Sequence, residues 1–471
     1  MMMKRACFVS LSLLGGVCLC DTERHLKSVE DLIQFSRDVN SGLTHVGTTV
    51  YLDSDLEFTA NESEAFAPIG KTVQNSFRGV FDGQGNVVKN LTMSHSLLFT
   101  VGLFGYTVNA TVKNTVLDST CSIFGSFTSY GVNVGGLIAQ CDASAGGACT
   151  VENAVSMAAV SSKTENGAYI GGIIGYCAPS GSAATCTVKN SANYGTVTLA
   201  GVPTIARLGG IVGHCFTVSG SACYVQNCLN YGTVLYEGIA VNLAKVGGII
   251  GSNYNNNLYI DNCISGGSIV SAHTTSLSLG SIAGYVAGSE INAITHSSWT
   301  SDLDGYQGVG EEGYYANITI EDMGLIALDD AKMEEINKYA ESKKYDRWFM
   351  LHLNGGRING LAQDTLIVSQ GHLPDAVKEN STFKGWFVDE GCSKRYDPKA
   401  GENVKDVYAK YAKVKEEVSS ETIAIIVLSC VSVIAIVALI VLAIILGNTL
   451  EKLRRATSGN SERTKLINED N

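Results

Sequence analysis

The chain has 471 residues, enough for about three domains, and only 17% of them are charged. Glycine is frequent at 51 residues and proline is rare at 5, but collagen needs glycine at about one third of positions, so collagen is excluded. The net charge is −12, and no basic stripe is present, which argues against a nucleic-acid partner because phosphate attraction needs clustered cations. The 14 cysteines indicate an oxidising compartment.

The N-terminus has the pattern of a secretory signal peptide. Lys4 and Arg5 precede an apolar run from Ala6 to Leu19, and the polar Asp21 follows. The run is too short to span a bilayer comfortably. We therefore expect residues 1–20 to be removed from the mature protein.

A second apolar segment lies near the C-terminus. Residues 423–446 carry no charge, and at about 1.5 Å per residue their length suffices to cross a bilayer. Lys452, Arg454 and Arg455 follow, so this side is expected to be cytoplasmic. The prediction is a type I single-pass protein of the plasma membrane, with a juxtamembrane segment 413–422 and a cytoplasmic tail 447–471. An envelope-anchored or lumenal orientation with the same sidedness is the alternative.

Residues 101–300 repeat a glycine-rich phrase. Its copies recur 33 to 38 positions apart, which indicates a solenoid. Each copy combines β-branched residues with glycines, so a strand is favoured, and glycine in a strand marks a close backbone approach. The copies are VGLFGY at Val101, VGGLIA at Val134, IGGIIG at Ile170, LGGIVG at Leu208, VGGIIG at Val246 and LGSIAG at Leu279.

A second phrase, which carries an asparagine, follows each glycine phrase. If the repeats stack as rungs about 4.8 Å apart, these amides lie above one another and each can donate a hydrogen bond to the next. We therefore predict an asparagine ladder of Asn114, Asn153, Asn190, Asn227, Asn262 and Asn292.

Three cysteine pairs recur between the glycine and asparagine phrases. A disulfide within each pair would close the loop between two strands. Two further cysteines follow their asparagines in consecutive repeats, within disulfide reach if the rungs stack. The predicted disulfides are Cys141–Cys149, Cys177–Cys186, Cys215–Cys223 and Cys228–Cys263. No CxxC doublet and no histidine at ligand spacing accompanies them, so neither a metal nor a cofactor is predicted.

The segment 21–100 is expected to start the solenoid. Ser28 has the pattern of a helix N-cap, and VYLDSDLEF alternates as a strand. The phrases FAPIG at Phe66 and FRGVFDGQGNVVKNLTM at Phe77, together with the glycine phrases, resemble the GLUG-motif family of surface proteins. The resemblance covers Lys27 to Trp299, and it implies a right-handed β-solenoid of adhesin type and an extracellular attachment role.

Charge density rises after Trp299. Residues 301–365 are predicted to be a linker with a helix. In 366–412, FKGWFVDEGCSKRYDP and VKDVYAKYA resemble one internalin-type B repeat, also called the Listeria–Bacteroides repeat, with Tyr411 in place of the usual final Trp. The resemblance implies a small β-rich module that serves as a membrane-proximal spacer.

An enzymatic role is not predicted from the charged residues. Glycan cleavage needs paired carboxylates or acids with cations in fixed geometry. The nine charged residues between Val132 and Gly284 form no recurrent acid pair: Asp142, Glu152, Lys163, Glu165, Lys189, Arg207, Glu237, Lys245 and Asp261. A role in turns explains the remaining acidic candidates better than catalysis or calcium binding does; these are Asp53, Asp55, Asp82 and the segment 302–305. A membrane-anchored polysaccharide lyase or hydrolase is the alternative, and it predicts acidic residues that converge in one groove.

Short motifs indicate modification and sorting. The predicted N-glycosylation sites are Asn61, Asn90, Asn109, Asn317 and Asn380. In the tail, Glu462 with Leu466 and Ile467 fits a dileucine signal for a sorting adaptor, and Thr457 fits a kinase site. Together these features predict a mainly β, single-pass surface glycoprotein that attaches to an extracellular protein or glycan. A passive coat protein or endocytic receptor is a further alternative.

Overall fold

The computed structural model describes residues 22–127, 131–239, 244–255, 257–272, 277–300, 307–313, 316–326, 330–358, 365–369, 373, 375–397, 406–413 and 436–455. Contacts divide the chain into two units, residues 1–412 and 413–471, and each is described by itself. The predicted signal peptide, the first part of the predicted membrane span and the predicted tail motifs lie outside the described residues.

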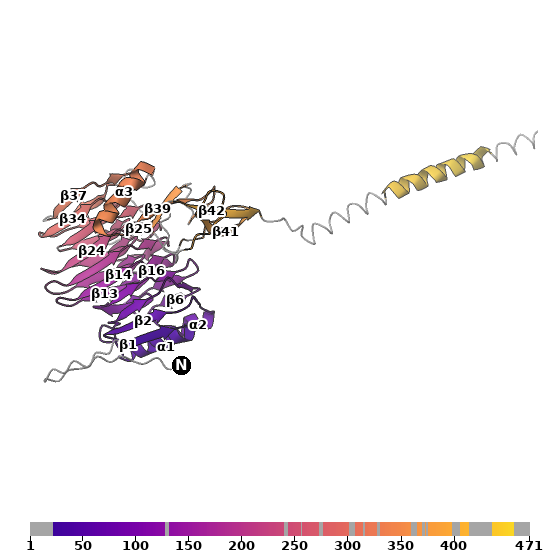
Figure 1. Cartoon of the computed structure of the whole chain (residues 1–471). Coiled ribbons are helices and arrows are strands. Elements are labelled where there is room, and N and C mark those ends of the chain that lie inside the picture. The colour runs from indigo at the N-terminus through magenta and orange to yellow at the C-terminus, as the bar shows by residue number, and fades with distance from the viewer. Residues whose placement is uncertain are drawn as a thin grey trace, which may run out of the picture. The chain divides into compact units, whose positions relative to one another are not determined.

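Unit 1 is a stack of rungs in which each strand pairs in parallel with its equivalent in the next repeat (Figure 1). The predicted mainly β solenoid is confirmed, and a complete rung contributes one strand to each of five parallel sheets, A to E. Sheet A contains β1 (Thr22–Leu26), β2 (Thr48–Leu52), β4 (Val80–Asp82), β9 (Thr111–Lys113), β14 (Ala148–Glu152), β19 (Thr185–Lys189), β24 (Ala222–Gln226), β29 (Leu258–Asp261), β34 (Ile291–Thr295) and β37 (Asn317–Glu321).

Sheets B and D follow sheet A along each rung. Sheet B contains β3 (Leu56–Glu57), β5 (Val87–Lys89), β10 (Val116–Leu117), β15 (Val155–Ser156), β20 (Ala192–Asn193), β25 (Leu229–Asn230), β30 (Ile264–Ser265), β35 (Ser298–Trp299) and β38 (Gly324–Leu325). Sheet D contains β6 (Thr92–His95), β11 (Ser122–Gly125), β16 (Ala159–Thr164), β21 (Val197–Gly201), β26 (Val234–Tyr236) and β31 (Ile269–Ser271).

Sheets E and C contain the two halves of each glycine phrase. Sheet E contains β7 (Thr100–Val101), β12 (Val132–Gly135), β17 (Gly167–Gly171), β22 (Ile205–Gly209), β27 (Ala244–Gly247) and β32 (Leu277–Gly280). Sheet C contains β8 (Phe104–Val108), β13 (Ile138–Ala143), β18 (Ile174–Pro179), β23 (Val212–Phe216), β28 (Ile250–Tyr254), β33 (Ala283–Val286) and β36 (Val309–Glu312).

The glycine phrases fold the chain back on itself between sheets E and C. A Cβ at Gly135 would lie 2.0 Å from the carbonyl oxygen of Ile138, and one at Gly175 would lie 2.7 Å from the carbonyl oxygen of Val134. Only glycine permits this approach of backbone to backbone. The outer faces of sheets E and C are therefore brought close to each other along the stack.

A helix closes the N-terminal end of the solenoid. Helix α1 (Val29–Asn40) starts at the predicted N-cap, Ser28, whose side chain accepts a hydrogen bond from the backbone of Asp31. Leu32 and Phe35 are fully buried, and the ring of Phe35 packs edge-on against Phe77 at 5.7 Å. The short α2 (Ala60–Ala65) follows with a capping box. Terminal caps of this kind cover the end of a repeat stack.

The region after the solenoid packs against its flank. Helix α3 (Asp330–Lys343) precedes a four-stranded sheet F of β40 (Thr365–Ser369), β39 (Trp348–His352), β42 (Asp406–Lys413) and β41 (Ser381–Phe387). Buried residues of this module, including Met333 and Trp348, form one apolar cluster with Tyr194 and Tyr231 beside sheet B. We expected a linker with a helix over 301–365 and a small β-rich spacer module over 366–412; the described residues of both segments pack on the solenoid.

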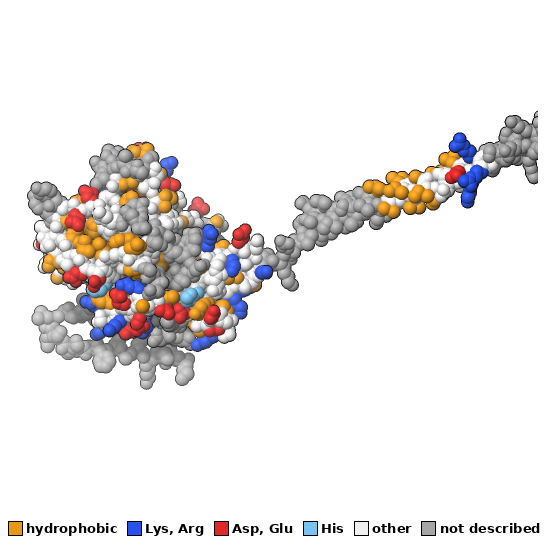
Figure 2. All heavy atoms as spheres, turned by 90° about the horizontal axis from the view of Figure 1, so that it is seen from above, with side chains coloured by type: hydrophobic (Ala, Val, Ile, Leu, Met, Phe, Trp, Pro, Cys, Tyr) orange, Lys and Arg blue, Asp and Glu red, His pale blue; other side chains and the backbone are white. Residues whose placement is uncertain are grey.

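Unit 2 contains one described helix, Ile436–Arg455. It is long and apolar enough to cross a membrane by length and composition, and none of it is buried in the protein. Figure 2 shows its apolar surface and the cluster of basic side chains at one end. It overlaps the second half of the predicted span 423–446.

Candidate functional site

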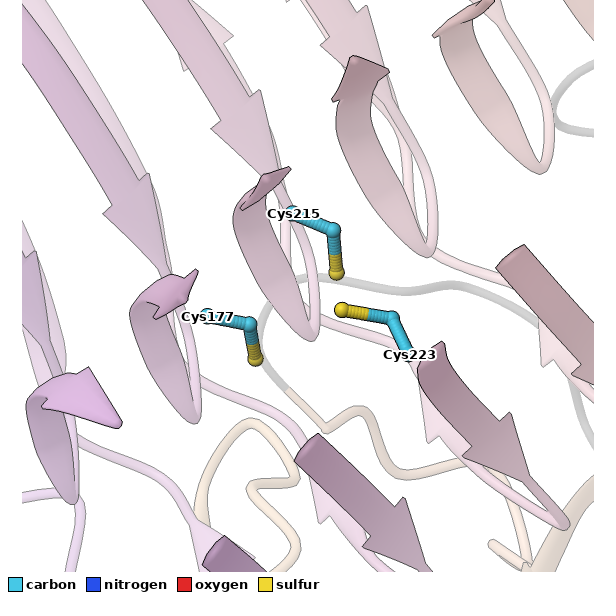
Figure 3. A group of neighbouring side chains, drawn as sticks. All are labelled: Cys177, Cys215 and Cys223. Atoms are coloured by element: carbon cyan, nitrogen blue, oxygen red, sulfur yellow. The ribbon is translucent and has the colours of Figure 1, made fainter. Parts of the chain in front are cut away.

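Two of the predicted disulfides are present. Cys141 bonds to Cys149 and Cys177 bonds to Cys186, each pair joining a strand of sheet C to the next strand of sheet A. In the next rung, Cys215 and Cys223 are buried thiols. Figure 3 shows that their sulfur atoms point toward each other beside Cys177, and the three sulfurs lie within 4.8 Å of one another. Because Cys177 is already bonded to Cys186, this group does not offer three thiolates to a metal.

The predicted Cys228–Cys263 bond is wrong in this structure, because both residues are buried thiols. Each thiol donates a hydrogen bond to the carbonyl oxygen two residues earlier, at 3.2 Å for Cys228 and 3.4 Å for Cys263. The hydroxyls of Ser191 and Ser297 make the same bond in other rungs. The two cysteines therefore occupy a position at which a small side chain satisfies a turn carbonyl.

The asparagine ladder consists of two hydrogen-bonded runs. In the first run, Asn153 donates to Asn114 at 3.2 Å, and Asn114 donates to Asp82 at 2.9 Å. In the second run, Asn262 donates to Asn227 at 2.7 Å, and Asn227 donates to Asn190 at 2.9 Å. The first five predicted ladder residues all have positive φ between 49° and 52°, which asparagine tolerates better than most residues.

The prediction that Asn292 is the sixth ladder residue is wrong, because the ladder position in this rung lies four residues later. Strand register places Asp261 opposite Thr295, so His296 lies above Asn262, with a φ of 51°. Asn292 instead points into the solenoid, where its Oδ1 accepts hydrogen bonds from Asn253 and from the backbone of Leu258, both at 3.1 Å. The phrase INAIT contains an asparagine by coincidence, whereas the turn position is occupied by histidine.

A second amide pair was missed by the sequence analysis. Asn193 and Asn230 are completely buried in sheet B, and Asn193 donates to Asn230 at 2.9 Å. Each also bonds the backbone of the glycine two residues later. The signal was the phrase NYGTV, which occurs at both Asn193 and Asn230.

The predicted glycosylation sites lie at the surface. Four of the five asparagines are exposed and Asn90 is partly exposed. Asn90, Asn109 and Asn380 have positive φ, Asn61 is in α2, and Asn317 is the first residue of β37.

The strongest concentration of chemistry-bearing side chains is where sheets C and E face each other. We call this set the polar seam. It consists of Asn133, Gln140, Asp142, Tyr169, Tyr176, Arg207, His214, Lys245, Tyr254, Tyr285 and Glu311. The glycine fold-over brings them together: Asn133 of β12 donates to Gln140 of β13 at 3.0 Å across the seam.

Aromatic rings run along the seam from rung to rung. Tyr176 stacks on His214 at 5.5 Å with an angle of 11° between the rings, and Tyr169 lies 4.7 Å from His214. Further along, Tyr254 lies 4.8 Å from Tyr285. The four tyrosines are partly exposed, so part of each side chain is accessible to solvent along the seam.

Two cations are enclosed within the seam. The guanidinium of Arg207 lies over the ring of Tyr254 at 5.3 Å and donates to its hydroxyl at 2.9 Å. The ammonium of Lys245 lies 4.1 Å from the centre of the Tyr285 ring and forms an ion pair with Glu311. Lys245 is only 3% exposed, so burial lowers its pKa while the Glu311 carboxylate opposes that shift.

Burial also moves the pKa values of other seam groups. It raises the pKa of Asp142 to about 6, against the effect of the hydrogen bond from Gln140. It lowers the pKa of His214 to about 3, with Arg207 contributing, so that this imidazole is neutral at physiological pH.

The seam carboxylates do not form a hydrolytic pair with each other. Register places Gln140, Tyr176, His214, Ser252, Tyr285 and Glu311 in consecutive rungs. At about 4.8 Å per rung, Asp142 and Glu311 are separated by about 20 Å or more, and acid pairs of glycoside hydrolases need about 5–9.5 Å. Glu152, another of the nine charged residues, lies on sheet A. Its Oε1 atom forms an ion pair with Nζ of Lys189 at 2.8 Å.

The repeat phrases did not reveal the seam, because its residues change type from one repeat to the next. The tyrosines at the position after Gly175 and Gly284 were a usable signal, since Tyr176 and Tyr285 follow the last glycine of their phrases.

Comparisons with known proteins give little further information. No family model matches the chain, and no curated protein matches it. A solved structure described as "a putative immunoglobulin A1 protease from Bacteroides ovatus" is similar at a TM-score of 0.41 and 16% identity, covering 74% of this chain and 91% of that chain. The resemblances to GLUG-motif proteins and to an internalin-type B repeat stay predictions.

Proposed function

We propose that the protein is a cell-surface, single-pass glycoprotein that attaches to an extracellular protein or glycan through the polar seam of its β-solenoid. The supporting observation is the run of partly exposed tyrosines that the glycine fold-over places along one line. Tyrosine and arginine are enriched in recognition surfaces because they combine large contact area with hydrogen-bonding groups.

The construction of the seam suits binding of a repetitive or extended ligand. Parallel stacking spaces equivalent side chains about 4.8 Å apart, and the enclosed Arg207 and Lys245 hold the rings of Tyr254 and Tyr285 in fixed positions. A preorganised surface loses less side-chain entropy on binding. The signal-peptide pattern and the apolar C-terminal helix support display of this surface outside a cell.

The test compares seam variants with a matched aromatic pair elsewhere. Tyr176→Ala and Tyr285→Ala should each weaken saturable binding of the purified full chain to cells and to immobilised glycans by about tenfold or more. Tyr224 and Tyr259 stack at 5.0 Å on sheet A, so Tyr224→Ala and Tyr259→Ala are the controls and should bind normally. Circular dichroism would verify that all four variants are folded.

The outcomes separate the candidate functions. Equal loss in seam and control variants, or no saturable binding by the wild type, would refute attachment through the seam. Cleavage of the bound glycan would favour the lyase or hydrolase alternative. Uptake of the protein into cells, with no binding to any immobilised glycan, would favour an endocytic receptor.

A further inference from the structure

Among the described residues, the last rung at the C-terminal end of the solenoid leaves some core-facing side chains exposed. Ile294 is completely buried, and register places Ile320 of β37 directly above it in the last rung. Ile320 is 43% exposed. Leu325 lies in β38, the last strand of sheet B, and is 49% exposed. At the other end, α1 buries its apolar side chains against the first rungs. In the part of the chain that the structure describes, the two ends of the solenoid thus differ in apolar exposure.

The last rung also presents a sheet edge. Among the described strands, β37 is the terminal strand of the ten-stranded sheet A and pairs only with β34. An edge strand with free backbone groups and apolar neighbours is a template for pairing with another chain. A second copy of this protein could extend the stack there unless something obstructs the edge.

A glycosylation motif starts at this edge strand. Asn317 is the first residue of β37, it is exposed, and Thr319 completes the motif. The backbone oxygen of Asn317 accepts a hydrogen bond from Asn292 at 3.4 Å, which ties the start of the strand to the preceding rung. The other four motifs lie in α2 or at turns with positive φ, so Asn317 differs from them by its place on the edge.

We propose that an N-linked glycan on Asn317 covers the open end of the solenoid and prevents end-to-end association of two copies. The Nδ2 atom of Asn317 forms a bond to the anomeric carbon of an oligosaccharide. The bond from that carbon to a polyprenyl diphosphate breaks, the diphosphate leaves, and the amide loses a proton. The hydrated sugar obstructs the edge as charged side chains or a covering loop do in other sheets.

The experiment uses the full chain, purified in detergent from a glycosylating cell line. Peptide mass spectrometry measures glycan occupancy at Asn317, and sedimentation measures the protein mass as a function of concentration. The wild type should carry the glycan and remain monomeric. Asn317→Gln and Thr319→Ala both remove the motif, and both should raise the mass about twofold with increasing concentration.

Two further variants make the result specific. Asn61→Gln removes an exposed motif in α2, far along the chain from the open end, and should stay monomeric. Asn317→Gln combined with Ile320→Lys places a charge in the open core end and should restore the monomer. An unmodified Asn317 in the wild type, or a monomeric Asn317→Gln variant at all concentrations, would overturn the proposal.

Discussion

The indole Nε1 of Trp348 donates a hydrogen bond to Oδ1 of Asn227, which lies 121 residues earlier in the chain. The same amide donates to Asn190 at 2.9 Å and to the backbone oxygen of Asp346 at 3.0 Å, and it accepts from Asn262 at 2.7 Å. One ladder asparagine thus joins three rungs and holds the C-terminal module against the solenoid.

Replacement of Asn227 should be among the most destabilising changes in the ladder. Asn227→Ala leaves several buried polar groups unpaired and forces a positive φ on alanine, so we expect a loss of about 3–5 kcal/mol in unfolding free energy. Asn227→Gly should recover about 1 kcal/mol of this, because glycine adopts the same φ without strain. Chemical denaturation measures both. Asn114→Ala, in the partly exposed first run of the ladder, is the control and should lose less.

Docking of the module should depend on Asp261. The hydroxyls of Tyr339 and Tyr345 both donate to its carboxylate at 2.8 Å, and burial, together with these bonds, raises the pKa of both tyrosines. Asp261→Ala leaves both hydroxyls without their acceptor. We expect faster amide hydrogen exchange across 330–358 with the solenoid strands unchanged. Asp322→Ala, which removes an exposed carboxylate nearby, is the control. Unaltered exchange in the Asp261 variant would contradict this account of docking.

The fold was predictable from the sequence because its determinants recur at equivalent positions. Repeated glycine phrases, asparagine turns and cysteine pairs each indicated stacked rungs, and the register of β14, β19 and β24 places them so. The last ladder position could not be predicted from residue type, because His296 occupies a turn position that asparagine occupies in earlier rungs.

Apart from the tyrosines that follow Gly175 and Gly284, the seam could not be predicted from the sequence, and neither could the docked module, for different reasons. The seam depends on how two outer faces approach at the fold-over, and its residues change type from rung to rung. Docking of the module depends on contacts such as Trp348 with Asn227, which no periodicity in the sequence indicates.

The partly buried carboxyl of Asp142 should make stability depend on pH. Its pKa is raised from 3.8 to about 6 in the folded protein, so the folded state binds more protons between these values. Stability contributed by this group therefore falls as the pH rises from about 4 to about 6. Asp142→Asn should be more stable than the wild type at pH 7, by up to about 3 kcal/mol, and the difference should vanish near pH 4. Thermal or chemical denaturation at several pH values measures that difference. A pH-independent difference would contradict burial of an ionised carboxylate.

The free cysteines in the part of the chain that the structure describes should differ in reactivity. Cys121, Cys215, Cys223, Cys228 and Cys263 are buried, whereas Cys392 is partly exposed. Burial raises the pKa of Cys223 and Cys263, which lowers their thiolate fraction further. Iodoacetamide at pH 8 should label Cys392 in the folded protein and the five buried thiols only after denaturation. Mass spectrometry of the labelled peptides measures which cysteines have reacted. Labelling of Cys223 before denaturation would contradict the prediction and show that its rung opens.

The most direct test of the stacked-rung account is the distance between spin labels on sheet A. Thr49, Thr111 and Tyr259 lie in one register column, with four steps from Thr111 to Tyr259 and six from Thr49 to Tyr259. At about 4.8 Å per step, pulsed electron paramagnetic resonance of Thr111→Cys/Tyr259→Cys should give about 19 Å between backbone positions, and Thr49→Cys/Tyr259→Cys about 29 Å. Narrow distributions that differ by about 10 Å would support the stack and the seam built on it. Equal or broad distances would contradict both.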